Sequence, residues 1–144
     1  MVGYLAQSFR NFVIFNGRAT RREFWLFAAL FAAATIGGFL FDGRSGTTSA
    51  VAADMGIAQL VAFVVLLLPF LTVSVRRLHD AGRSGFWLLF LYLPYLAFQA
   101  AGAREAAQQA AAGAFLIGAL VVFIQWALPG DKGANRFGPD PSGM

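Results

Sequence analysis

Residues 76–87 read RRLHDAGRSGFW, and this stretch decides how the rest of the chain is interpreted. It holds the single histidine of the chain together with three arginines and one aspartate. The sequence on either side is long and apolar, so the stretch is a short polar connection between two hydrophobic segments. Gly82 is well suited to end a helix in the left-handed conformation, and Ser84 is a favourable N-cap for the next one. We therefore predict a tight turn between two helices.

The composition places the chain among membrane proteins. Of its 144 residues, 58% are hydrophobic and 12% are charged, whereas soluble domains have about 45–50% and about 25%. The mean hydropathy is +0.64, and the length allows one compact domain. The chain has no cysteine and one histidine, which excludes disulfides, thiolate chemistry and histidine-rich metal centres. We predict no metal and no other cofactor.

Four apolar segments predict membrane-spanning helices. They cover residues of about 24–41, 56–75, 85–101 and 111–128, and none of them contains Asp, Glu, Lys, Arg or His. At 1.5 Å per residue, an 18-residue segment is about 27 Å long, close to the roughly 30 Å hydrocarbon core. Thr20 and Glu23 have capping-box spacing just before the first segment. Residues 42–55 and 102–110 are polar connections, and residues 129–144 are a turn-rich, irregular tail.

Residues 3–15 have a different pattern, because Leu5, Phe9 and Phe12 recur at helical spacing while polar residues lie on the other faces. This segment is too short and too polar to span a membrane, and its pattern is typical of an interfacial helix. The predicted fold is therefore an all-α integral membrane four-helix bundle, residues 1–144 forming a single membrane domain with a short N-terminal amphipathic interfacial helix.

The basic residues predict the orientation of this bundle. Nine of the 11 lysines and arginines lie in the N-terminal segment, the 76–87 stretch and the tail, and only Arg44 and Arg104 lie in the two opposite connections. Under the positive-inside rule, both termini are cytoplasmic. The net charge of +4 does not indicate nucleic-acid binding, since the basic residues adjoin apolar segments, where orientation signals belong.

The same polar segments supply the candidate site for an anionic ligand or partner. Its residues are Arg18, Arg21, Arg22, Arg76, Arg77, His79, Asp80, Arg83, Asn135 and Arg136. In one interpretation these residues form a basic pocket for a phosphate, a lipid headgroup or an acidic segment. In the other, the arginines only fix topology and Asp80 neutralises one of them. The mixture of an acid, an imidazole and a glycine-serine turn favours the first interpretation, because topology requires only positive charge.

Three segments also resemble the signature segments of a known family. They are residues 15–25 (FNGRATRREFW), 76–87 (RRLHDAGRSGFW) and 133–141 (GANRFGPDP). Together they are similar to a family of small bacterial inner-membrane proteins catalogued as domain of unknown function 805. The resemblance implies a multi-spanning protein of the bacterial inner (plasma) membrane. It implies no activity, substrate or catalytic residue. We expect the three segments to fold against one another on one side of the bilayer.

The preferred hypothesis is a non-enzymatic membrane protein whose cytoplasmic face binds an anionic partner such as a phospholipid headgroup or another membrane protein. One alternative is a membrane enzyme acting on a lipid or isoprenoid phosphate, with Asp80 or His79 as general base. Another is an oligomeric channel or transporter. Stripes of small residues that allow close helix packing leave a homo-oligomer open; they are Ala29, Ala33 and Gly37, and Ala110, Ala114 and Gly118.

Overall fold

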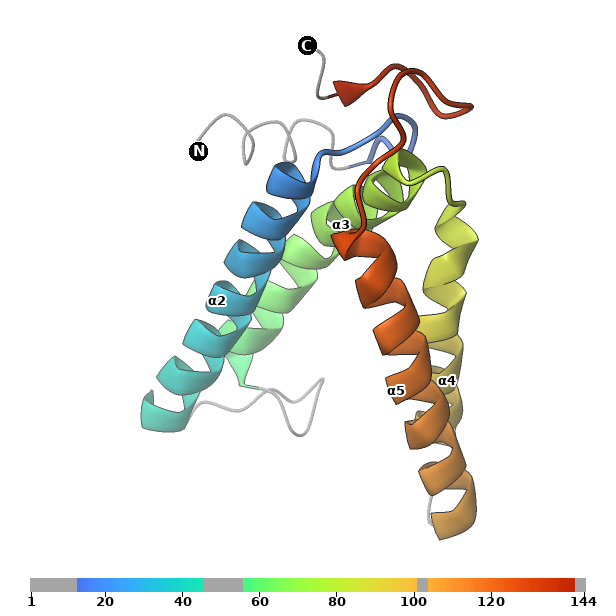
Figure 1. Ribbon diagram of the computed structural model, residues 1–144. Helices are drawn as coiled ribbons and strands as arrows, with labels where there is room; N and C mark the ends of the chain where they lie inside the picture. The colour runs from blue at the N-terminus through green and yellow to red at the C-terminus, as the bar shows by residue number, and fades with distance from the viewer. Residues whose placement is uncertain (1–12, 46–55, 101–103, 142–144) are drawn as a thin grey trace. The chain divides into compact units, whose positions relative to one another are not determined.

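The computed structural model describes residues 13–45, 56–100 and 104–141. These residues form an all-α fold whose elements are α2 (Arg21–Ser45), α3 (Ile57–Asp80), the 3₁₀ helix η1 (Gly85–Leu88), α4 (Leu89–Ala100) and α5 (Glu105–Ala127) (Figure 1). The interfacial helix expected at residues 3–15 lies mostly outside the described residues, and residues 13–15 are not helical.

Three of the four α-helices are long and apolar enough to cross a membrane. These candidate spans are Arg21–Gly43, Ile57–Asp80 and Glu105–Ala127. The fourth apolar helix, Gly85–Phe98, is shorter than these spans and begins with the 3₁₀ turn that Ser84 caps. α3 runs through Pro69 without a break and continues five residues beyond the end at Val75 that the hydropathy pattern predicts.

The described residues divide into two compact units, the first containing residues 22–74. In this unit α2 packs on the first part of α3 through phenylalanine rings, with Phe31 stacked on Phe70 at a centroid distance of 4.7 Å. Phe31 also lies 5.8 Å from the ring of Phe63. The two helix backbones lie close together at Gly38, where a Cβ atom would be 2.6 Å from the Cα of Gln59. Only glycine fits there.

Asp42 joins the two helices of this unit at the opposite end from Phe24. Residues 42–45, predicted to be a loop, instead continue α2, and Asp42 is only 6% exposed. Its carboxylate accepts hydrogen bonds from the amides of Ala58 at 3.1 Å and Gln59 at 2.9 Å. These amides belong to the first turn of α3, which has no internal acceptors for them and favours negative charge. A side chain of α2 thus serves as the N-cap of α3.

The second unit contains residues 17–21 and everything described after Ser74. Here α4 and α5 lie side by side (Figure 1), and a Cβ atom on Gly118 would be 1.9 Å from the carbonyl oxygen of Phe90. Gly118 is therefore an internal contact of this hairpin. By contrast Gly37, in the other small-residue stripe, has no neighbour within 4 Å, so a role for that stripe as an oligomer face stays a prediction.

The turn from α3 to η1 forms as its sequence predicts. Gly82 has a φ of +67°, its amide donates to the carbonyl of His79, and the amide of Arg83 donates to the carbonyl of Leu78 at 2.8 Å. This is the Schellman arrangement, which satisfies the last carbonyls of a helix. Ser84 is the N-cap of η1, and its hydroxyl accepts from the amide of Phe86 at 3.4 Å.

Candidate functional site

The structure divides the ten predicted site residues by burial. Five have side chains that are largely withdrawn from the surface: Arg18, Arg76, Arg77, His79 and Asp80. Asn135 is partly buried, whereas Arg21, Arg22, Arg83 and Arg136 are exposed. All of them except Arg22 belong to the second unit. Within that unit the residues around 18, 76–83 and 131–137 contact one another, as the three sequence segments predict.

Arg18 connects three parts of the unit through one guanidinium group. Its Nε donates to Asp80 Oδ1 at 2.9 Å, while Nη1 and Nη2 donate to the carbonyls of Gly133 and Asp131, each at 2.5 Å. The side chain is 1% exposed. A guanidinium has a planar fork of donors, and here the fork holds the end of α3 and the tail together. We refer to residues 129–141 as the tail from here on.

Arg77 connects the end of α5 to Asp80 in a similar way. Its Nε donates to the carbonyl of Trp126 at 2.9 Å, Nη2 donates to the carbonyl of Leu128, and Nη1 donates to Asp80 Oδ2. The last four carbonyls of an α-helix have no partner inside the helix and carry partial negative charge. Arg77 therefore caps α5 from α3, with a side chain that is completely buried.

Asp80 is the one carboxylate between these two arginines, and each of its oxygens accepts from one of them. Two positive charges and one negative charge would leave an excess of one positive charge in a buried place. Four backbone carbonyls, two from the tail and two from the end of α5, supply the remaining negative potential. Every guanidinium nitrogen and carboxylate oxygen in the Arg18–Asp80–Arg77 cluster thus has a partner, as buried charges require.

The backbone of residues 17–19 and a second arginine complete this arrangement. The amide of Ala19 donates to the carbonyl of Arg76 at 3.0 Å, and Arg76 Nη2 donates back to the carbonyl of Arg18 at 3.0 Å. The helical spacing of Arg76 and Asp80 permits an ion pair. The structure instead gives the Asp80 oxygens to Arg18 and Arg77.

His79 and Asn135 hold the tail against the turn. The His79 ring stacks on Phe137 with centroids 3.9 Å apart and planes within 2°. Its Nδ1 lies 3.2 Å from the carbonyl oxygen of Gly17, and this nitrogen must be the donor because a carbonyl can only accept. Asn135 Nδ2 donates to the carbonyl of His79 at 2.9 Å, while Asn135 Oδ1 accepts from the amide of Phe137.

Two residues of the tail matter for reasons that the sequence pattern did not reveal. A Cβ atom on Gly130 would be 2.1 Å from Asp80 Oδ2, so only glycine allows the chain to pass the carboxylate. The amide of Asp131 donates to the carbonyl of Asp80 at 2.8 Å. Pro129 and Gly130 are recognisable as a helix stop, but the requirement for close approach depends on where the end of α3 lies.

Two exposed arginines of the same unit lie over aromatic rings. The Arg83 guanidinium carbon is 5.7 Å from the centre of a Trp87 ring, and that of Arg136 is 4.7 Å from the Phe137 ring. Arg136 Nη2 also donates to the carbonyl of Gly82 at 3.2 Å. Stacking fixes the plane of a guanidinium while leaving its edge toward solvent. These groups can bind an anion without dismantling the buried cluster.

The residues that the structure describes offer few means for other chemistry. Among them, no group of three or more His, Asp or Glu side chains is placed to hold a metal ion. Each oxygen of Asp80 already accepts from an arginine. What the arrangement does supply is a pair of exposed arginines beside a buried cluster whose charged groups are hydrogen-bonded.

A fold of long apolar helices with a polar cluster at their ends defines a multi-spanning membrane protein. Residues 12–139 match the family described as "Protein of unknown function (DUF805)", and the chain belongs to this family. It is similar to the inner membrane protein YhaH of Escherichia coli, with 32% identity over 132 residues, 92% of this chain and 90% of that protein.

Two further proteins from the same organism are similar to most of the chain. The inner membrane protein YhaI is 28% identical over 92% of this chain and 89% of its own length. The uncharacterized protein YiiR is 32% identical over 88% of this chain and 84% of its own length. No solved structure matches the chain. The chain is thus a multi-spanning inner-membrane protein of the DUF805 family.

Proposed function

We propose that residues 1–144 form one membrane domain that crosses the inner membrane four times, with both termini in the cytoplasm. α5 is long enough to cross, and α4 lies beside it with only a short connection between them (Figure 1). The partner helix of such a hairpin returns through the same bilayer. Nine of the 11 basic residues then lie on the cytoplasmic side, together with an interfacial helix at residues 3–15.

Reporter fusions test this topology. A reporter that is active only in the cytoplasm should be active when it is attached after residue 144. A reporter that is active only outside the cytoplasm should be active when it is inserted between residues 101 and 104. An extracytoplasmic C-terminus would refute the arrangement. A cytoplasmic connection between α4 and α5 would also refute it, because α4 would then not cross the membrane.

The function that the geometry supports best is binding of anionic phospholipid headgroups at the cytoplasmic face. The observation that carries this proposal is that some arginines are buried in hydrogen bonds to the protein while others are exposed. Arg18 and Arg77 use their donors on protein acceptors, whereas Arg83 and Arg136 are exposed and oriented by aromatic rings. Exposed basic groups next to a membrane attract anionic lipids by about 1 kcal/mol each.

Catalysis at the same place is less well supported. A general base needs an oxygen or nitrogen within hydrogen-bond reach of the substrate proton. Each oxygen of Asp80 already accepts from Arg18 or Arg77, so neither is open to a substrate proton. His79 is covered on one face by Phe137. For these reasons we prefer headgroup binding to hydrolysis of a lipid phosphate.

Native mass spectrometry from nanodiscs that contain equal amounts of phosphatidylglycerol and phosphatidylethanolamine tests the proposal. We expect the protein to retain phosphatidylglycerol preferentially, and the double variant Arg83→Gln/Arg136→Gln to lose most of this preference. Arg104→Gln removes an equally exposed arginine at the other end of α5 and is the matched control. Equal retention of the two lipids by the wild-type protein would refute the proposal.

A further inference from the structure

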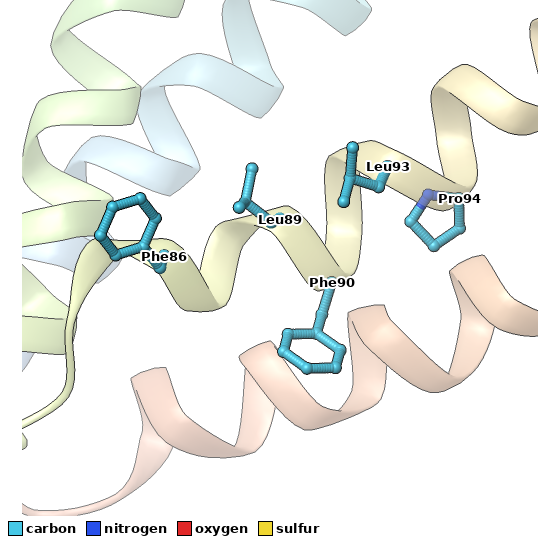
Figure 2. A pocket seen from close by; sticks show the side chains of 5 residues that line it. All are labelled: Phe86, Leu89, Phe90, Leu93 and Pro94. Carbon is cyan, nitrogen blue, oxygen red and sulfur yellow. The ribbon is translucent and has the colours of Figure 1, made fainter.

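An open apolar groove runs along η1 and α4 in the second unit. It has a volume of about 480 Å³ and is lined by Phe86, Leu89, Phe90, Leu93 and Pro94. In Figure 2, the side chains of Phe86, Leu89 and Leu93 point to one side of the helix, while Phe90 points toward α5. These positions follow the i, i+3, i+4, i+7 spacing of one helix face. The groove is therefore lined by apolar side chains of η1 and α4 alone.

None of the residues that line the groove is charged, and Arg83 is the basic residue that precedes them in the chain. Arg83 precedes Phe86 by three residues, is exposed, and lies over Trp87. Arginine binds phosphate through a planar fork of donors, and tryptophan is typical of the membrane interface. The nine residues from Phe86 to Pro94 cover about 12 Å, because each step along a helix rises by about 1.5 Å. One leaflet contributes about 15 Å of hydrocarbon, half of the roughly 30 Å core.

We propose that this groove holds one acyl chain of an anionic phospholipid whose phosphate is bound by Arg83. The inference rests on the proposed headgroup-binding function and deepens it, because it assigns the lipid to one place and includes its apolar part. An arginine just before the apolar strip, and a strip nearly as long as one leaflet is deep, match the two halves of such a lipid. A purely apolar ligand or a neutral helix would not use Arg83.

The test compares two ways of damaging the site with two matched controls, again by native mass spectrometry from mixed nanodiscs. Arg83→Gln removes the phosphate ligand, and Leu93→Trp fills the groove. Arg104→Gln and Leu120→Trp make the same changes at an exposed arginine and at an exposed leucine of α5 outside the groove. We expect each site variant to lower phosphatidylglycerol retention roughly tenfold, as for loss of one charge-assisted hydrogen bond or a comparable apolar contact. The controls should retain it.

Other outcomes separate the failure of this inference from failure of the proposed function. If Arg83→Gln abolishes retention but Leu93→Trp does not, headgroup binding stands and the groove assignment is wrong. If Leu93→Trp instead converts a dimer to a monomer, a second copy of the chain covers the groove. Absence of phosphatidylglycerol preference in the wild type would refute both. Leu93→Phe, a smaller filling, replaces Leu93→Trp if thermal unfolding shows that the tryptophan variant does not fold.

Discussion

Replacing Asp80 with asparagine tests whether the Arg18–Asp80–Arg77 cluster holds the second unit together. Asparagine keeps the size of the side chain and one acceptor oxygen, but it replaces the other oxygen with an amide group that can only donate. That group would meet a guanidinium donor, because each Asp80 oxygen accepts from a different arginine. The change therefore removes one hydrogen bond, creates a donor–donor contact and leaves two buried positive charges without a counter-charge.

The size of the effect follows from burial. The side chains of Arg18 and Arg77 are 1% and 0% exposed, and that of Asp80 is 7% exposed. Removal of one partner from a buried ion pair costs about 3–5 kcal/mol, a large part of a typical unfolding free energy of about 5–15 kcal/mol. For a chain of this size, about 2–4 °C per kcal/mol gives a decrease in Tm of roughly 6–20 °C.

Thermal unfolding in detergent measures this decrease, and Asp131→Asn is the control. Asp131 belongs to the same unit as Asp80 but is exposed, and its Oδ2 accepts from Asn135 at 3.1 Å. The control should stay within about 0.5 kcal/mol of the wild type. The effect of Asp80→Asn should also be the same at low and high salt, because buried charges are weakly screened. A loss below about 1 kcal/mol, or one equal to that of the control, would refute the reasoning.

Three further variants test the packing of each unit by the same thermal measurement. Gly118→Ala should destabilise by at least about 2 kcal/mol because its Cβ would meet the α4 backbone at 1.9 Å, whereas Gly113→Ala, with no neighbour within 4 Å, should be neutral or stabilising by up to about 1 kcal/mol; equal effects would contradict the assigned helix contact. Asp42→Ala should cost about 0.5–2 kcal/mol through loss of the α3 cap, and an unchanged Tm would show that water replaces the carboxylate. Gly82→Ala should be worse than Gly133→Ala, since both glycines have positive φ but only the first Cβ would also meet a carboxylate, at 2.6 Å; the reverse order would be inconsistent with the described tail.

The sequence predicts the local features well and the tertiary role of the charges poorly. The apolar segments and the turn at Gly82 and Ser84 are recognisable because helix length and capping are local properties. Whether an arginine such as Arg18 faces lipid headgroups or the protein interior cannot be recognised in this way. Two of its acceptors are backbone carbonyls 113 and 115 residues away. Every residue has a backbone carbonyl, so the sequence does not indicate which ones Arg18 contacts.

The sequence also does not predict which residues make the contacts between helices. A stripe of small residues predicts close packing at Gly37, yet the neighbouring Gly38 makes the contact. Successive residues of an α-helix differ by about 100° in direction, so the rotation of α2 about its axis decides which glycine faces α3. Asp42 illustrates the converse case. A single acid at the end of an apolar segment predicts a loop, and only the position of α3 makes it a cap.

The distance along the chain between Arg18 and the tail has a consequence for biosynthesis. Membrane helices are made from the N-terminus at about 5–20 residues per second, so Arg18 is synthesised at least several seconds before Asp131 and Gly133. Until those residues emerge, its guanidinium lacks two of the three acceptors that it has in the finished protein. The buried cluster can therefore close only after α5 and the start of the tail have been made, so the N-terminal segment waits for the last part of the chain.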